Sequence, residues 1–127
     1  MHLQFANIKM NDKFKYVKLN YLEELSNGNN EFIIEIINIF IQQVPEFISN
    51  MNKFLEDGNY ESLSREAHTA KSSALIFNLE ETAEILKTIE ITASENNTDN
   101  LPALINKADT GLTAACRELT AYIEEIA

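Results

Sequence analysis

One short segment of the chain combines an imidazole, an amine and two hydroxyl side chains. It reads Ala-His-Thr-Ala-Lys-Ser-Ser over residues 67–73. At about 3.6 residues per helical turn, His68, Lys71 and Ser72 fall on one stripe of a helix, beside an alanine-rich stripe that can face a core. An imidazole is a good nucleophile near neutral pH. The segment therefore indicates phosphoryl transfer through His68.

The elements that position this segment are predicted to be helices. Apolar residues keep helical spacing from residue 30 to residue 58, which is the strongest amphipathic pattern in the chain. Pro45 interrupts this pattern without changing its phase, so a kink is favoured over a break into two helices. The helix that carries His68 is expected to begin after a cap at Asn59 and to end near Asn78, since asparagine tolerates a left-handed stop.

Three further helices are expected around these two. A short one should stop at Gly28, and Asn30 is expected to cap the long helix that follows. Another is predicted over residues 79–94, and a last one over residues 101–126, with Gly111 as a weak point inside it. No segment has the pattern of a strand. The sequence thus predicts an all-α fold, an antiparallel up-down four-helix bundle with a short extra N-terminal helix.

The turn near Asn78 predicts which residues of two neighbouring helices share a height. Residues whose numbers sum to about 157 should lie at similar heights in an antiparallel pair, which places His68 near the level of Glu90 and Lys71 near the level of Lys87. Height does not fix the direction in which a side chain faces. Two alternatives for Glu90 therefore stay open, a hydrogen-bond partner of the imidazole or an ordinary surface carboxylate.

Composition limits the classes of protein to consider. The chain has 127 residues, 45% of them hydrophobic, which suits one bundle domain over residues 16–127 after a lysine-rich arm over residues 1–15. The net charge of −10 disfavours nucleic-acid binding. Cys116 is the single cysteine and is predicted to be a small core residue. No apolar run is expected to span a bilayer and no secretory signal is recognised, so a cytoplasmic protein is expected.

From about residue 16 to residue 126 the sequence resembles the histidine-containing phosphotransfer (HPt) domain of bacterial phosphorelays. The matching segments are residues 67–73, 77–79 and 89–90, with supporting matches at 21–25, 45–46 and 57–59. Three positions depart from the family's pattern, because Ala70, Ser72 and Asn78 stand where the family usually has leucine, glycine and glycine. Each replacement is mild, since alanine still packs, serine is still small and asparagine tolerates a left-handed turn.

The resemblance implies a phosphocarrier without its own nucleotide or metal site. His68 would accept a phosphoryl group from a phospho-aspartate of a receiver domain, with Lys71 stabilising phosphoryl charge and Glu90 orienting the imidazole. Magnesium would come with the receiver domain, which belongs to a hybrid histidine kinase or a response regulator. The chain would act as a monomer, and the side chains expected at the docking surface are Arg65, Ser72, Leu75 and Lys87.

Two alternatives belong to other classes of protein. The first is an inactive bundle that docks a kinase or receiver domain without carrying phosphate, and the presence of both His68 and Lys71 argues against it. The second is a metalloenzyme built on Glu-x-x-His pairs inside a bundle. Arg65 occupies the position three before His68, and the other histidine, His2, lies at the N-terminus. The metal reading is therefore poor, and metal analysis of the purified protein would test it.

Overall fold

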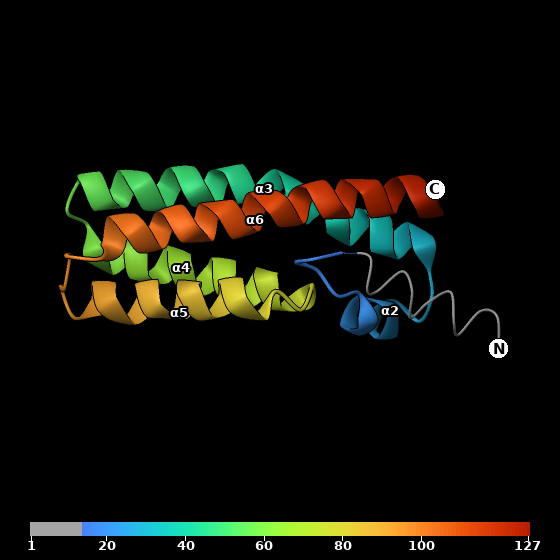
Figure 1. Ribbon diagram of the computed structural model, residues 1–127, viewed down its shortest axis with the longest axis horizontal. Helices are drawn as coiled ribbons and strands as arrows, with labels where there is room; N and C mark the ends of the chain where they lie inside the picture. The colour runs from blue at the N-terminus through green and yellow to red at the C-terminus, as the bar shows by residue number, and fades with distance from the viewer. Residues whose placement is uncertain (1–13) are drawn as a thin grey trace.

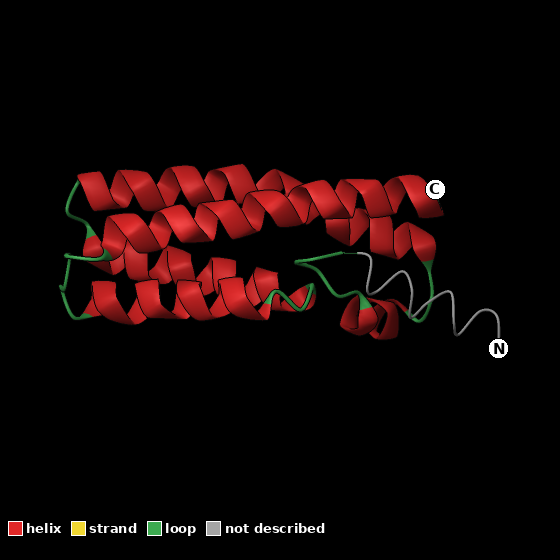
Figure 2. Ribbon diagram, viewed as in Figure 1, coloured by secondary structure: helices red, strands yellow, loops and turns green. Residues whose placement is uncertain are grey.

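Helices account for most of the chain that the structure describes, which is residues 14–127 of a computed structural model (Figures 1 and 2). The long helices run up and down alternately and pack side by side, and no strand forms within residues 14–127. The predicted all-α bundle with a short extra helix is confirmed. The helices are α2 (Asn20–Ser26), α3 (Asn30–Glu56), α4 (Tyr60–Ile76), α5 (Glu80–Ser94) and α6 (Leu101–Ile126).

The core lies between apolar stripes on the four long helices, as their spacing predicts. Helix α3 buries large side chains, whereas the buried stripe of α4 consists of Leu63 and three alanines, Ala67, Ala70 and Ala74. Small side chains allow the backbones of two helices to approach closely. Helix α4 accordingly has its most extensive contact with α5, the helix that follows it. Helix α2 covers α3 where α3 and α6 extend past the other two helices (Figure 1).

The two turns that flank α4 form as predicted. The side-chain oxygen of Asn59 accepts a hydrogen bond from the Ser62 backbone N–H at 3.2 Å, which satisfies one of the free donors at the helix start. At the other end Asn78 adopts a left-handed backbone with φ of 54°. These two asparagines therefore set the length of α4 and the position of the reversal into α5.

The N-cap of α3 is Asn29, so the prediction of Asn30 is wrong by one residue. The backbone of Asn29 is extended, and its side chain accepts from the Phe32 backbone N–H at 3.2 Å. A cap must keep a non-helical backbone while its side chain reaches into the first turn. Asn30 is already helical, and its amide instead donates to the Ile126 carbonyl oxygen at 3.5 Å.

Helix α3 runs unbroken through Pro45, as the phase of its apolar stripe favours. By length and composition it is apolar enough to cross a membrane, so the expectation that no apolar run reaches that length is wrong. The core helix of a soluble protein passes the same test. In α3 the buried side chains, among them Ile37, Phe40 and Met51, face the other helices of the bundle.

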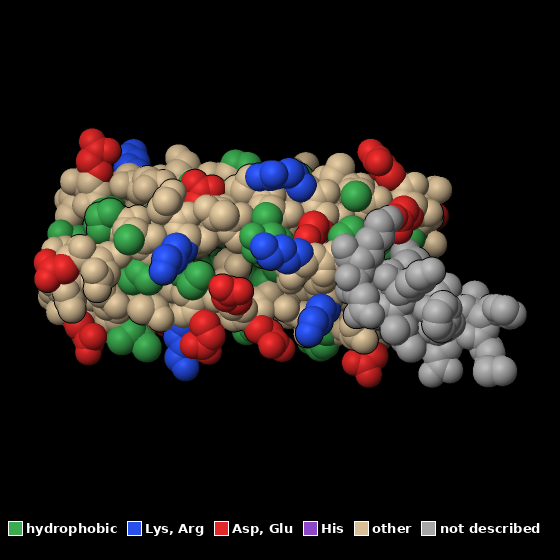
Figure 3. Space-filling view, viewed as in Figure 1, with side chains coloured by type: hydrophobic (Ala, Val, Ile, Leu, Met, Phe, Trp, Pro, Cys, Tyr) green, Lys and Arg blue, Asp and Glu red, His purple; other side chains and the backbone are tan. Residues whose placement is uncertain are grey.

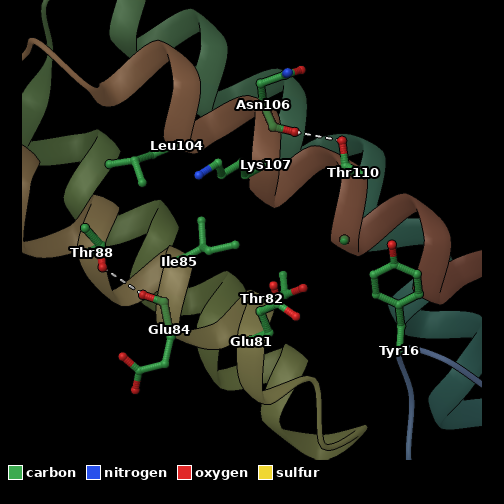
Figure 4. Close-up of a pocket in the computed structure, with 11 residues that line it drawn as sticks. Tyr16, Glu81, Thr82, Glu84, Ile85, Thr88, Leu104, Asn106, Lys107 and Thr110 are labelled. Atoms are coloured by element: carbon green, nitrogen blue, oxygen red, sulfur yellow. Dashed lines mark hydrogen bonds between the residues drawn. The ribbon is translucent and has the colours of Figure 1, made fainter.

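Gly111 marks a close approach of α6 to α5 and is not merely a weak point in its helix. A methyl group at this position would collide with the side chain of Thr82. Next to this contact the two helices border a cleft of about 530 Å³ (Figure 4). Ile85 from α5 faces Lys107 from α6 across it, and Tyr16 closes one end. Figure 3 shows that basic and acidic side chains are interspersed on the face of the bundle that it draws.

The segment before α2, residues 14–19, is tied to two other parts of the bundle, and we name it the N-terminal strap. The Glu118 carboxylate accepts hydrogen bonds from three consecutive backbone N–H groups, those of residues 15–17, at 2.8 to 3.2 Å. The Lys18 N–H donates to the Phe77 carbonyl oxygen at 3.0 Å. The strap thus joins α6 to the turn after α4. Of the predicted arm, residues 1–15, all but the last two lie outside the described residues.

Candidate functional site

His68 lies in the middle of α4, on the stripe that borders α5. Its side chain is 58% exposed, so the ring can be reached from solvent. The next side chain along the stripe is short, because Ser72 is exposed and its hydroxyl turns back to donate to the His68 carbonyl oxygen at 3.2 Å. The helix therefore leaves room over the imidazole for a bulky partner.

Glu90 of α5 connects the imidazole to the lysine. Its Oε2 lies 3.0 Å from His68 Nδ1, and its Oε1 accepts a hydrogen bond from Lys71 Nζ at 3.1 Å. The predicted common height of His68 and Glu90 is confirmed, and Glu90 is more than an isolated surface carboxylate. Lys87 is exposed and forms no ion pair within residues 14–127. Lys71 turns to the carboxylate because opposite charges attract, whereas two ammonium groups repel.

The electrostatics of the group keep Glu90 ionised. Burial raises the pKa of its carboxyl, but the hydrogen bond and charge of Lys71 and the charge of His68 together outweigh burial, so this pKa lies below its ordinary value. An ionised carboxylate can only accept hydrogen bonds, so the contact with His68 requires a proton on Nδ1. In a neutral ring the lone pair is then on Nε2. The site thus presents an oriented nucleophilic nitrogen.

Two polar contacts that the sequence analysis missed hold α4 on its two flanks. The Ser64 hydroxyl donates to the backbone carbonyl oxygen of Glu90 at 2.8 Å. On the other side, the Asn50 amide of α3 donates to a carboxylate oxygen of Glu66 at 3.0 Å. Residue 64 lies one turn before His68 on the same stripe, which was an available signal for the first contact. The second has no signal in the sequence, because it depends on how α3 and α4 face each other.

The residues predicted for docking lie on the two helices that carry His68 and Glu90. Leu75 is 47% exposed, and Arg65 is exposed with its guanidinium 3.3 Å from the Glu61 carboxylate of the same helix. Lys87 is exposed on α5. Ile91, one position after Glu90, is 46% exposed and was not singled out from the sequence. Exposed apolar and basic side chains therefore lie on both helices that present the site.

Metal ligands and the Cys116 thiol are the other candidate chemical groups among the described residues. Within residues 14–127 no three or more His, Cys, Asp or Glu side chains form a group that could hold a metal ion. Cys116 is half-buried, and burial raises the pKa of its thiol to about 11. The thiol therefore stays protonated near neutral pH, in keeping with a packing role. His2 lies outside the described residues.

Comparison with known proteins identifies the family to which this chain belongs. The Hpt domain matches residues 35–127, a range that contains both His68 and Glu90. Among solved structures, the chain is similar to histidine-containing phosphotransfer protein B (HptB) from Pseudomonas aeruginosa PAO1. The TM-score is 0.81 at 16% sequence identity, over 87% of this chain and 96% of that chain, so this likeness concerns the fold. No curated protein matches by sequence. Because the family match covers well over half of the chain, the chain belongs to the Hpt domain family, a family of histidine phosphotransfer modules.

Proposed function

We propose that this chain is a phosphocarrier in which His68 accepts a phosphoryl group from a phospho-aspartate of one receiver domain and passes it to another. The observation that carries the proposal is the 3.0 Å contact between His68 Nδ1 and Glu90 Oε2, made by a side chain that is 58% exposed. An oriented and accessible imidazole on an Hpt bundle suits this chemistry, because the reacting phosphoryl group arrives on a separate protein.

The transfer step follows from the state of the ring. The Nε2 lone pair attacks phosphorus in line with the bond to the aspartate oxygen. The N–P bond forms as that P–O bond breaks, and the aspartate carboxylate leaves with the bonding electrons. Nδ1 keeps its proton, so the ring gains positive charge, which the Glu90 carboxylate at 3.0 Å stabilises. Transfer to the second receiver domain reverses these changes.

Lys71 is the residue we propose to stabilise the phosphoryl oxygens. It follows His68 by three residues, so both side chains leave the same side of α4. Its amine hydrogen-bonds to Glu90 at 3.1 Å and keeps 21% of the side chain exposed. Rotation about the lysine side chain would bring the amine from the carboxylate to a phosphoryl group on Nε2. The positive charge would then act on the transferring group, where negative charge concentrates.

The remaining elements of the proposal concern partners. Receiver domains of a hybrid histidine kinase or a response regulator would dock over the imidazole, against Arg65, Ser72, Leu75 and Lys87. The receiver domain would hold the magnesium ion, and this chain would contribute neither nucleotide nor metal. We propose that it acts as a monomer in the cytoplasm, where such receiver domains meet their kinases.

Phosphorus NMR after reaction with phosphoramidate tests the proposal without a protein partner. Phosphoramidate transfers its phosphoryl group to an imidazole and releases ammonia. We expect one acid-labile N–P resonance with the shift of an Nε2 adduct, and no such resonance for His68→Gln. A resonance of the Nδ1 adduct would contradict the proposed orientation of the ring. Absence of any adduct on the folded protein would refute His68 as the acceptor.

A further inference from the structure

The buried faces of α4 and α5, which pack against each other along a common seam, contain several small side chains. Ala67, Ala70 and Ala74 of α4 are fully buried, and Ala83 and Ala93 of α5 are buried as well. Large interdigitating side chains resist sliding of one helix along another, because each must leave the hole that it fills. Methyl groups give a smoother contact. Helix α5 also buries two larger side chains, Leu86 and Ile89, so apolar packing and polar contacts together determine the register of α4 against α5.

Three side chains of α4 meet a single residue of α5 across this seam. Those of His68 and Lys71 reach the carboxylate of Glu90, whereas the Ser64 hydroxyl reaches its backbone carbonyl oxygen at 2.8 Å. The first two contacts move with the rotamer of Glu90. The third joins α4 to the backbone of α5 itself. It is also partly buried, which makes an unpaired partner costly.

We propose that Ser64 is a positioning residue, whose hydrogen bond to the Glu90 carbonyl oxygen sets the register of α4 against α5 and so holds the carboxylate against the imidazole. A slip of one residue moves a helix by about 1.5 Å along its axis. Such a shift would lengthen the 3.0 Å contact and bend it away from a straight hydrogen bond. The inference rests on the proposed function only in that His68 is taken as the reacting group.

The other flank of α4 has a polar contact of its own, which does not involve Ser64. Asn50 of α3 holds Glu66 of α4 at 3.0 Å, which ties α4 to the longest helix of the bundle. Loss of the Ser64 hydroxyl leaves this tie in place. The expected consequence is a less well-defined position of Glu90 relative to His68.

The test compares Ser64→Ala with a matched control, Ser94→Ala. The control also removes a serine hydroxyl that donates to a backbone carbonyl oxygen, but its acceptor, Ile91, belongs to the same helix at 2.7 Å. Both changes put alanine into a helix, where it is well tolerated. The readouts are the nitrogen chemical shifts of the His68 ring, which report its tautomer, and the rate of phosphorylation by phosphoramidate. Each is measured with Glu90 present and in a Glu90→Ala background.

We expect Ser64→Ala to lower the fraction of His68 that carries its proton on Nδ1 and to slow phosphorylation about three- to fivefold, the effect of one net hydrogen bond. Ser94→Ala should change neither. In the Glu90→Ala background, Ser64→Ala should have no further effect, because it acts through Glu90. Wild-type ring shifts and rate in Ser64→Ala would overturn the inference, as would an equal loss in both backgrounds. A wild-type protein that takes no phosphoryl group would refute the proposed function instead, and the ring shifts would still test Ser64.

Discussion

Replacing Glu90 by glutamine is the change that isolates the electrostatic part of the proposed mechanism. Glutamine keeps the shape of the side chain, and its carbonyl oxygen can still accept a hydrogen bond from Nδ1 of His68. What is lost is one negative charge, 3.0 Å from the imidazole and 3.1 Å from the Lys71 amine. We therefore expect the ring to stay oriented while the positive charge that develops on it during transfer is less stabilised.

The structure sets the size of the expected effect. A hydrogen bond to a charged group contributes about 1.5–3 kcal/mol when shielded, whereas exposed ion pairs contribute about 1 kcal/mol or less. The His68 side chain is 58% exposed and that of Glu90 28%, so the interaction belongs near the lower values. A loss of about 1–1.4 kcal/mol slows transfer roughly five- to tenfold. Glu90→Ala, which also removes the orienting contact, should be slower again.

The assay is single-turnover transfer from an excess of a phosphorylated receiver domain, quenched over time and counted as label on this chain. The matched control is Glu84→Gln, because Glu84 is an exposed carboxylate of the same helix that lines the cleft toward α6. The control should transfer at the wild-type rate. A Glu90→Gln rate within twofold of wild type would refute the electrostatic role of this carboxylate.

Glu90→Gln should also change how the free energy of unfolding depends on pH. The pKa of the Glu90 carboxyl lies below its ordinary value in the folded chain, since Lys71 and His68 outweigh the effect of burial. The stabilisation from this carboxylate is therefore present at neutral pH and is lost as the pH falls through the lowered pKa. Urea unfolding of wild type and Glu90→Gln should differ at neutral pH and converge in acid. A difference that grows in acid would contradict the assigned direction.

Three further changes test the site and its supports. Lys71→Ala should slow transfer about tenfold through loss of phosphoryl charge stabilisation, with unchanged helicity by circular dichroism; an unchanged rate would exclude that role. Gly111→Ala should lower the free energy of unfolding by about 1–3 kcal/mol in urea titrations, because the new methyl group overpacks against Thr82. Adding Thr82→Ala should restore the stability. An increase in stability in the Gly111→Ala variant would contradict the close contact between α5 and α6. Glu118→Ala leaves three backbone N–H groups without their acceptor. It should lower the free energy of unfolding by about 1–3 kcal/mol and expose the N-terminal strap to proteases. The control is Glu124→Ala, which removes an exposed carboxylate from the same helix and should have neither effect.

Much of the fold could be predicted because its signals are local. The apolar stripes, the glycine turns and the asparagines at positions 59 and 78 each act within a few residues of themselves, and each has the predicted effect. The one misplaced cap shows the limit of such signals. Asn29 and Asn30 are chemically identical, and only the backbone angles distinguish the cap from the first helical residue.

The sequence could predict the height of Glu90 relative to His68, but not the direction in which the Glu90 side chain points. Antiparallel arithmetic brings Glu90 level with His68, since both lie about equally far from the turn at Asn78. Whether the carboxylate faces the imidazole depends on the rotation of α5, which packing against α4 and α6 decides. The pairing of the N-terminal strap with α6 had no signal at all. The three N–H groups bound by Glu118 lie more than 100 residues from it, and no local pattern indicates that pairing.

The central claim, that His68 carries a phosphoryl group between receiver domains, is tested most directly by transfer from phosphorylated receiver domains to this chain. Wild type and His68→Gln are each incubated with the same panel of labelled receiver domains, and acid-labile label on this chain is counted. We predict label on wild type alone, with chase of that label onto a second, unphosphorylated receiver domain. Label on both proteins would assign the acceptor to another residue. Label on neither, while the folded proteins still bind receiver domains in titrations, would contradict the phosphocarrier account and leave a docking module.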